Sequence, residues 1–138
     1  MMRQKIVTAL IDELQKISIE NGFYTDGLSV FEWLDKPLEE SEYPAVIVRD
    51  AKDDMQDNIP LEHRLRVEID IALQGRDVPI NLRDILSDVL RAVGNFEKKN
   101  NYDTTLVGNE FLIEHKDSIY GGVRVEIDIV YYTDRWMQ

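Results

Sequence analysis

The chain contains no cysteine among its 138 residues. This absence excludes disulfide scaffolds, zinc sites built on thiolates and cysteine nucleophiles. Positive charge is also scarce, because 16 lysine and arginine residues stand against 27 aspartate and glutamate residues, which gives a formal net charge of -11. A general affinity for nucleic acid needs cations that displace the counterions of the phosphates, so this balance argues against a nucleic-acid-binding protein.

Long hydrophobic runs are missing as well, since no stretch approaches the roughly 20 apolar residues of a membrane-spanning helix. At the start, the apolar residues of MMRQKIVTALIDELQKI are separated by charged ones, which is not the pattern of a signal peptide. Glycine-rich phosphate loops are absent too, because GNF and YGG have the composition of turns. We expect a protein made in the cytoplasm with no membrane partner, folded as a single domain over residues 1–138.

Two stretches have the periodicity of amphipathic helices. In the first, isoleucine, valine and leucine recur at helical spacing between positions 6 and 17, and an end near Gly22 is expected. The second is RDVPINLRDILSDVLRAVGNF, with Asp77 as its expected N-cap and Gly94 at its expected end. The following EKKNNYD is predicted to be a polar loop.

The remaining segments predict strands. Alternation is longest in LEHRLRVEIDIALQG, and the other candidates are residues 28–34, 45–50, 104–117 and 122–135. The acidic DAKDDMQDN segment, residues 50–58, is expected to be an exposed loop, and YGG a tight turn between the last two strands. The order predicts an α+β domain of two layers, with a mostly antiparallel or mixed sheet of four to five strands and two helices on one face.

The hexapeptide RVEIDI occurs twice, at residues 66–71 and 124–129. A strand, a crossover helix, a parallel strand and a tight turn would place the second copy antiparallel to the first. As neighbours, the two copies would match opposite charges: Arg66 with Asp128, and Asp70 with Arg124. The repetition is compatible with an ancient duplication and equally with convergence on a good strand pattern.

Four carboxylates project from the polar side of the repeat: Glu68, Asp70, Glu126 and Asp128. On neighbouring strands they could bind Mg²⁺ or Ca²⁺, which prefer oxygen ligands. The alternation of a half-buried sheet explains the same pattern without a metal. We therefore predict no metal, cofactor or catalytic residue in this chain.

An enzyme alternative comes from Glu114 and Lys116, which with Asp103 upstream resemble the metal-binding set of restriction-type nucleases. That chemistry needs both carboxylates on one Mg²⁺ and the lysine near the attacking water. However, Asp103 is expected in a polar loop. The two histidines, His63 and His115, are flanked by charged residues and are expected on the surface.

Aromatic residues are more numerous than a small core requires. The candidates for an interface are Phe31, Trp33, Tyr43 and Trp136. Trp136 lies near the C-terminus, where chains usually fray, and large aromatics at such positions often anchor interfaces. Local packing that ties down a terminus would explain the same residue.

The stretch NGFYTDGLSVFEWLDKPLEESEYPAVIVRD, followed by HRLRVEIDI, resembles the tail terminator (tail completion) proteins of long-tailed bacteriophages and prophages. The shared features are a leading helix, the GFYTDG turn, an acidic passage before a strand and a long alternating strand. A second helix and a final β-hairpin follow, so the resemblance extends over nearly the whole chain.

The resemblance implies a subunit of a homohexameric ring on the tail tube, located in the virion. Such a ring stops tube polymerisation and docks to the head connector, while DNA passes through it without specific binding. We hypothesise that some of the four repeat carboxylates face the channel or a subunit boundary, where negative charge would keep DNA from adhering. A neck or connector protein, or an adaptor domain with an acidic binding surface, remains an alternative.

Overall fold

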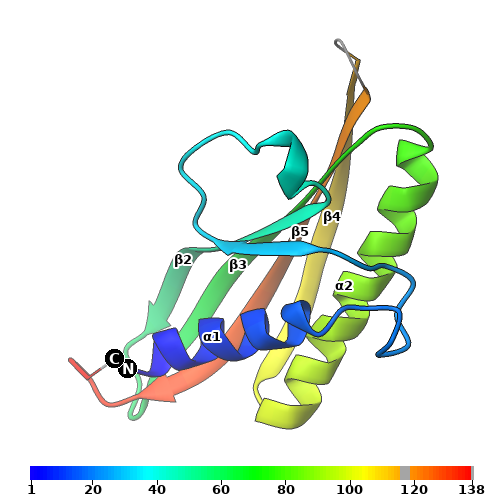
Figure 1. Ribbon diagram of the computed structural model, residues 1–138. Coiled ribbons are helices and arrows are strands. Elements are labelled where there is room, and N and C mark those ends of the chain that lie inside the picture. Colours follow the sequence, from blue (N-terminus) through cyan, green and yellow to red (C-terminus); the bar gives the residue numbers. More distant parts are fainter. Residues whose placement is uncertain (116–118, 138) are drawn as a thin grey trace.

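Two α-helices cover one face of a five-stranded sheet in the computed structural model, which describes residues 1–115 and 119–137 (Figure 1). In chain order the elements are α1 (Met2–Gln15), β1 (Ser29–Glu32), the short 3-10 helix η1 (Glu40–Glu42), β2 (Ala45–Gln56), β3 (Leu61–Gln74), α2 (Val78–Asn100), β4 (Asp103–His115) and β5 (Ile119–Thr133). The predicted α+β class is confirmed, because the sheet is mixed and both helices pack against it. Within the described residues, neither helix is long and apolar enough to cross a membrane.

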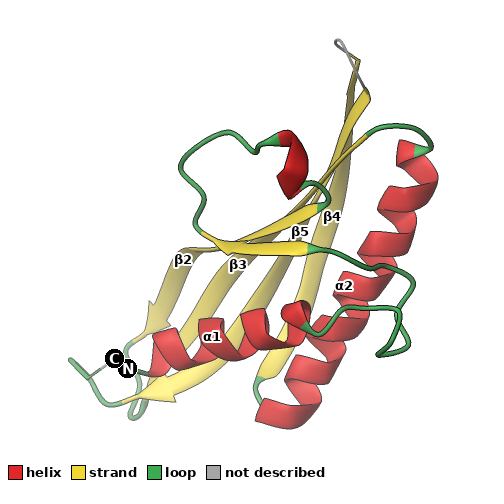
Figure 2. Cartoon of the chain, in the orientation of Figure 1, coloured by secondary structure: helices red, strands yellow, loops and turns green. Residues whose placement is uncertain are grey.

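The strands lie in the order β1-β2-β3-β5-β4 (Figure 2). β1 runs parallel to β2, and each other pair of neighbours is antiparallel. The two edges of this sheet differ. Among the described residues β4 forms one edge along its length, whereas β1 pairs only with residues 45–48 of β2 and leaves residues 49–56 as part of the opposite edge.

Alternation along β3 and β5 separates a core face from a charged face. The residues of β3 at odd positions from Leu65 to Ile71 are at most 1% exposed, while those at even positions are half-buried or exposed. The helices cover the odd-numbered face with a stripe of apolar residues: Ile6, Leu10 and Leu14 from α1, and Leu82, Ile85, Val89 and Phe96 from α2. Each such burial contributes roughly 1.5–3 kcal/mol.

Both helix ends differ from the prediction. α1 ends at Gln15 with Lys16 as its C-cap, and Gly22 lies in the following turn at a φ of 85°. α2 continues through the predicted polar loop to Asn100, so the expected end at Gly94 was wrong. The reason is burial, because Phe96 is fully covered and keeps the last turns of α2 on the core.

The predicted acidic loop at residues 50–58 was also wrong, because β2 extends to Gln56 and pairs with β3 over this stretch. Its carboxylates have partners that the sequence pattern did not indicate. The side chain of Asp50 accepts a hydrogen bond from Arg3 at 2.6 Å, and Asp53 is paired with His63.

The YGG segment belongs to β5 rather than to a turn. Gly121 faces the start of α2, where an added Cβ would lie 2.3 Å from Val78 Cγ1 and 2.7 Å from Leu82 Cδ1. A glycine is therefore required by the close approach of helix and strand rather than by turn geometry.

Candidate functional site

The two RVEIDI copies are neighbours in the sheet, and the predicted pairing is confirmed. β3 runs antiparallel to β5, which places Arg66 opposite Asp128 and Asp70 opposite Arg124. Glu68 and Glu126 face each other between these two pairs. Two like charges in directly opposite positions destabilise a sheet unless cations compensate them.

Arginines on both sides of the glutamate pair supply that compensation. Arg66 Nε lies 2.5 Å from Asp128 Oδ1, and Arg66 Nη1 lies 2.9 Å from Glu126 Oε2. Arg124 makes the equivalent contacts with the other copy, at 2.8 Å from Asp70 Oδ1 and 3.1 Å from Glu68 Oε2. The hydrogen bond and negative charge of Asp70 raise the pKa of Arg124, and Asp128 does the same for Arg66.

Two further arginines complete this set, and the sequence interpretation did not assign them. Arg49 on β2 pairs with Asp70 and lies 3.7 Å from Glu68 Oε1, while Arg64 on β3 lies 3.9 Å from Asp128 Oδ2. We call the eight side chains the charge lattice: Arg49, Arg64, Arg66, Arg124, Glu68, Asp70, Glu126 and Asp128. The four cations and four anions of the charge lattice cancel, so the lattice itself carries no net charge. The location of the four carboxylates in a channel remains a prediction.

The proposed nuclease set does not converge on one ion. Asp103 and Glu114 stand eleven residues apart on the single strand β4, which at ~3.3 Å per residue separates them by about 35 Å. Lys116 lies outside the described residues. Among the residues that the structure describes, no group of three or more histidine, aspartate or glutamate side chains is arranged to hold a metal.

His63 is buried, so its predicted surface position was wrong. It has no exposed surface, and its Nδ1 lies 2.9 Å from Asp53 Oδ2 and its Nε2 2.7 Å from Thr133 Oγ1. The imidazole stacks on Tyr131 at 4.3 Å, and the Tyr131 hydroxyl donates to Asp53 Oδ2 at 3.1 Å. The side chain of His115 is outside the described part of the chain.

This buried cluster has the order hydroxyl, imidazole, carboxylate that hydrolases use, but its burial prevents that use. A leaving group must reach the imidazole to take up its proton, and His63 exposes none of its surface. Burial and the neighbouring Asp53 raise the pKa of Tyr131 well above its ordinary value, so its hydroxyl stays protonated and donates. The cluster therefore joins β2, β3 and β5 mechanically.

The GFYTDG turn is fixed by α2, which sequence reasoning did not detect. The buried Asp88 accepts the backbone N–H groups of Tyr24 at 3.1 Å and Thr25 at 2.8 Å. Arg91 donates to the carbonyl of Gly22 at 2.7 Å and lies over the ring of Phe23. The ordered turn leaves Tyr24 71% exposed.

The four candidate interface aromatics differ in exposure. Trp136 is 90% exposed and Trp33 55%, whereas Phe31 and Tyr43 are half-buried. The indole of Trp33 donates to Asp50 Oδ1 at 2.7 Å, and the ring of Tyr43 lies 6.1 Å from that of Tyr120. Their roles in an interface remain predictions.

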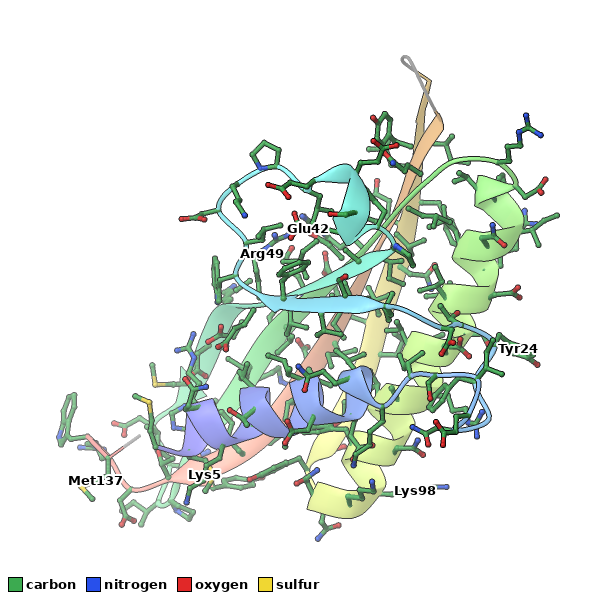
Figure 3. The ribbon with its side chains drawn as sticks, in the orientation of Figure 1. Lys5, Tyr24, Glu42, Arg49, Lys98 and Met137 are labelled. Carbon is green, nitrogen blue, oxygen red and sulfur yellow. The ribbon has the colours of Figure 1, made fainter. Side chains whose placement is uncertain are left out.

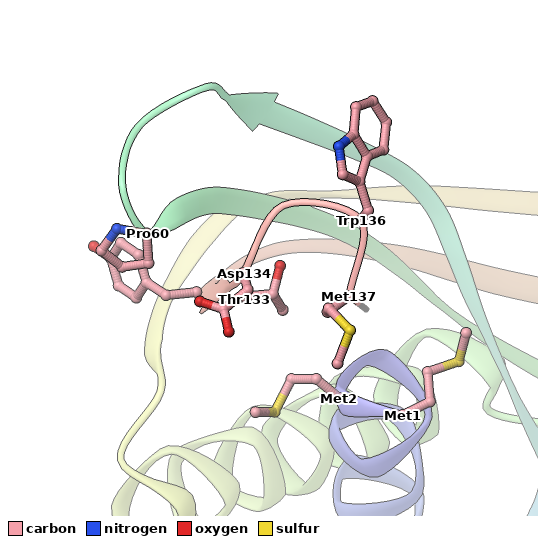
Figure 4. Close-up of a pocket in the computed structure, with 8 residues that line it drawn as sticks. Met1, Met2, Pro60, Thr133, Asp134, Trp136 and Met137 are labelled. Atoms are coloured by element: carbon pink, nitrogen blue, oxygen red, sulfur yellow. The ribbon is translucent and has the colours of Figure 1, made fainter.

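Trp136 belongs to an open groove where the two termini meet. The groove has a volume of about 820 Å³ and is lined by Met1, Met2, Pro60, Tyr132, Thr133, Asp134, Trp136 and Met137 (Figure 4). Met137 lies at the end of the molecule where α1 begins (Figure 3), and it lines the groove together with Met1 and Met2. We call this region the terminal surface, and its exposed apolar side chains include Met1 at 73% and Met137 at 68%.

A second apolar surface lies along the edge strand β4. Leu106, Phe111 and Leu112 are 51%, 45% and 62% exposed. Asp103 and Glu110 on the same strand are also exposed. An edge strand with exposed apolar side chains is a template for pairing with another chain.

Comparison with known proteins identifies no family for this α+β domain. No protein-family model matches the chain, and no curated protein matches it. A crystal structure from Akkermansia muciniphila is similar with a TM-score of 0.39 and 15% sequence identity, over 68% of this chain and 44% of that one. A similarity this low supports no argument about function.

Proposed function

We propose that this chain is a structural virion protein of the tail terminator type. Copies of it form a ring on the tail tube, stop its polymerisation and join the tail to the head connector. The proposal rests on the sequence resemblance, which extends over nearly the whole chain, and on one structural observation that carries it.

That observation is the presence of two separate surfaces where exposed apolar side chains gather, in addition to single exposed residues elsewhere such as Ile19 and Ile80. One follows the edge strand β4, and the other is the terminal surface. A subunit of a capping ring needs lateral contacts with its own copies and axial contacts with different proteins. Two separate contact surfaces satisfy that requirement.

The charge lattice is compatible with a wall that DNA passes. Each of its arginines already contacts a carboxylate, so a phosphate backbone finds no uncommitted arginine there. Binding to DNA gains free energy chiefly from cations that displace counterions, and paired arginines offer less of that gain. The lattice thus favours passage without adhesion.

Deletion of the gene from the phage or prophage that encodes the chain tests the proposal. The expected result is tails of uncontrolled length that carry no heads, seen by negative-stain electron microscopy, with normal tails restored by a plasmid copy. Tails of normal length that fail to join heads would instead identify a neck protein. Normal, infectious particles would overturn both assignments.

A further inference from the structure

The edge strand β4 has backbone groups free for a further strand. It pairs with β5 on one side only, so alternate residues direct their N–H and C=O groups away from the sheet. Glu97 covers the beginning of this edge by accepting the N–H of Thr104 at 3.0 Å. Beyond the bulge between Leu106 and Gly108, none of the described side chains covers the backbone of residues 109–113 in this way.

The composition of this open stretch does not protect it. Edge strands commonly carry lysine or proline, which discourage pairing with other chains. The β4 sequence DTTLVGNEFLIEH contains no lysine, arginine or proline. Its outer half instead carries Phe111, Leu112 and Ile113, which are 45%, 62% and 39% exposed. These features favour the addition of a strand at residues 109–113.

On the helix side of β4, an apolar groove separates the strand from α2. The groove has a volume of about 210 Å³ and is lined by Leu90, Val93, Gly94, Glu97, Thr104, Leu106 and Ile127. Leu106 and Phe111 lie opposite the core residues Ile127 and Val123 of β5, so they share the helix side. Both are incompletely covered, so an added strand with apolar side chains on this side would bury them further.

The open side of β4 offers a carboxylate instead. Glu110 lies opposite Arg124, and these two residues line a depression of about 380 Å³ together with Asp70 and Leu112. Arg124 forms its ion pairs with Asp70 and Glu68, and within the described part of the chain Glu110 has none. Two carboxylates and one arginine therefore line this depression, which leaves a negative charge for an incoming cation.

We propose that the β4 edge binds an extended segment of another protein in which apolar and cationic residues alternate. The segment continues the sheet at residues 109–113. Its apolar side chains enter the groove beside α2, and on the other face a lysine or arginine reaches Glu110 with its aliphatic stem over Leu112. The inference goes beyond the proposed function, since it stands on the edge strand whether or not the chain caps a tail tube.

The charges favour this occupant over a second copy of the chain. Two β4 strands side by side would bring together the carboxylates of both copies, with no lysine or arginine on either strand. Like charges on facing strands destabilise a sheet, whereas opposite charges stabilise it. Copies with a formal net charge of -11 also repel each other, while a cationic segment is attracted.

Synthetic peptides test the proposal. The probe is VKVKVKVK, and the matched control VKKVVKKV has the same composition but cannot place valine on one face and lysine on the other. Fluorescence anisotropy should show that VKVKVKVK binds at least severalfold more tightly than the control, and that VEVEVEVE does not bind. Hydrogen exchange of the isotope-labelled protein should show that VKVKVKVK protects alternate amides between residues 109 and 113, which contact through side chains alone would not do.

A charge reversal locates the contact. Glu110→Lys should weaken binding of VKVKVKVK severalfold, whereas Glu32→Lys, the same change at an exposed residue of β1 on the far edge of the sheet, should leave the affinity close to native. Equal affinity for the two lysine peptides, or protection that spares β4, would overturn the inference. So would protection of the same amides in a dimer of the native chain without peptide, because a second copy would then occupy the edge.

Discussion

The two faces of β3 hold their polar groups in different environments. On the helix-covered face, His63 has no exposed surface and contacts Asp53, Thr133 and Tyr131. On the open face, the Arg66 side chain keeps 35% of its surface exposed within the charge lattice. Water can replace a broken contact on the open face but not on the covered one. Substitutions at neighbouring residues of β3 should therefore lower the free energy of unfolding by different amounts.

The largest loss of stability is expected when His63 is replaced. His63→Ala removes the imidazole and leaves the carboxylate of Asp53 buried with fewer partners, in a site where its Oδ1 already has no hydrogen-bond partner among the described residues. We expect a loss of about 3–5 kcal/mol in the free energy of unfolding, measured by urea denaturation.

Arg64→Ala is the matched control, since Arg64 is the next residue and lies on the open face. Its side chain is 49% exposed and its ion pair is 3.9 Å long, so we expect a loss below about 0.5 kcal/mol. Equal losses in the two variants would show that burial does not separate the two faces.

A smaller loss is expected where the covered face meets α2. Gly121→Ala places a Cβ against Val78 and Leu82, so α2 or the two side chains must move, at a cost of about 1–3 kcal/mol. Gly108→Ala on β4 is the control, because its Cβ would have no neighbour within 4 Å. Comparable denaturation midpoints for the two variants would refute the close-approach explanation.

Substitutions in the charge lattice should lower the free energy of unfolding by less still. Arg66→Ala removes the hydrogen bonds to Asp128 and Glu126, but Arg64 remains near Asp128 and water reaches the site. We expect a loss of roughly 1 kcal/mol, smaller at high salt because ions screen partly exposed pairs. The His63→Ala loss should change little with salt, so unfolding in low and high NaCl separates the two faces a second time.

These contrasts also explain which features the sequence could predict. Period-two alternation excluded a one-residue slip between β3 and β5, which would expose the whole apolar face, and the match of opposite charges between the two RVEIDI copies then predicted Arg66 opposite Asp128. The same alternation places His63 on the same face as the buried Leu65. Its burial could therefore have been predicted from its position in the alternation, but the charged residues on either side of it favoured a surface position.

Other features depend on contacts that no local pattern encodes. Asp50 and Asp53 belong to a strand because Arg3, Trp33 and His63 come to them from distant segments. The last turns of α2 form because Phe96 reaches the core, although the surrounding residues are polar. The polar composition predicted loops at both places, but tertiary contacts stabilise a strand at the first and a helix at the second.

The final prediction concerns a buried carboxylate at the contact between α1 and α2 rather than on the open face of the sheet. Glu13 on α1 accepts hydrogen bonds from Lys16 at 2.9 Å and Lys99 at 2.8 Å, and its side chain is 6% exposed. Burial by itself raises the pKa of Glu13, but the two lysines outweigh it and hold the pKa below its ordinary value of 4.5. The unfolded chain therefore binds this proton first as the pH falls.

It follows that the stability from Glu13 is complete above pH 4.5 and is lost as the pH falls further, through the pKa of the folded state. Glu13→Gln should unfold at lower urea than the native chain near neutral pH, and the two curves should converge in acid. Glu110→Gln, an exposed carboxylate on β4, should leave the pH profile of the native chain unchanged. If Glu13→Gln kept the native slope between about pH 5 and 3, the acid sensitivity would have to come from another carboxylate, such as Asp50, where burial raises the pKa but hydrogen bonds from Trp33 and Arg3 outweigh it and hold the pKa below its ordinary value.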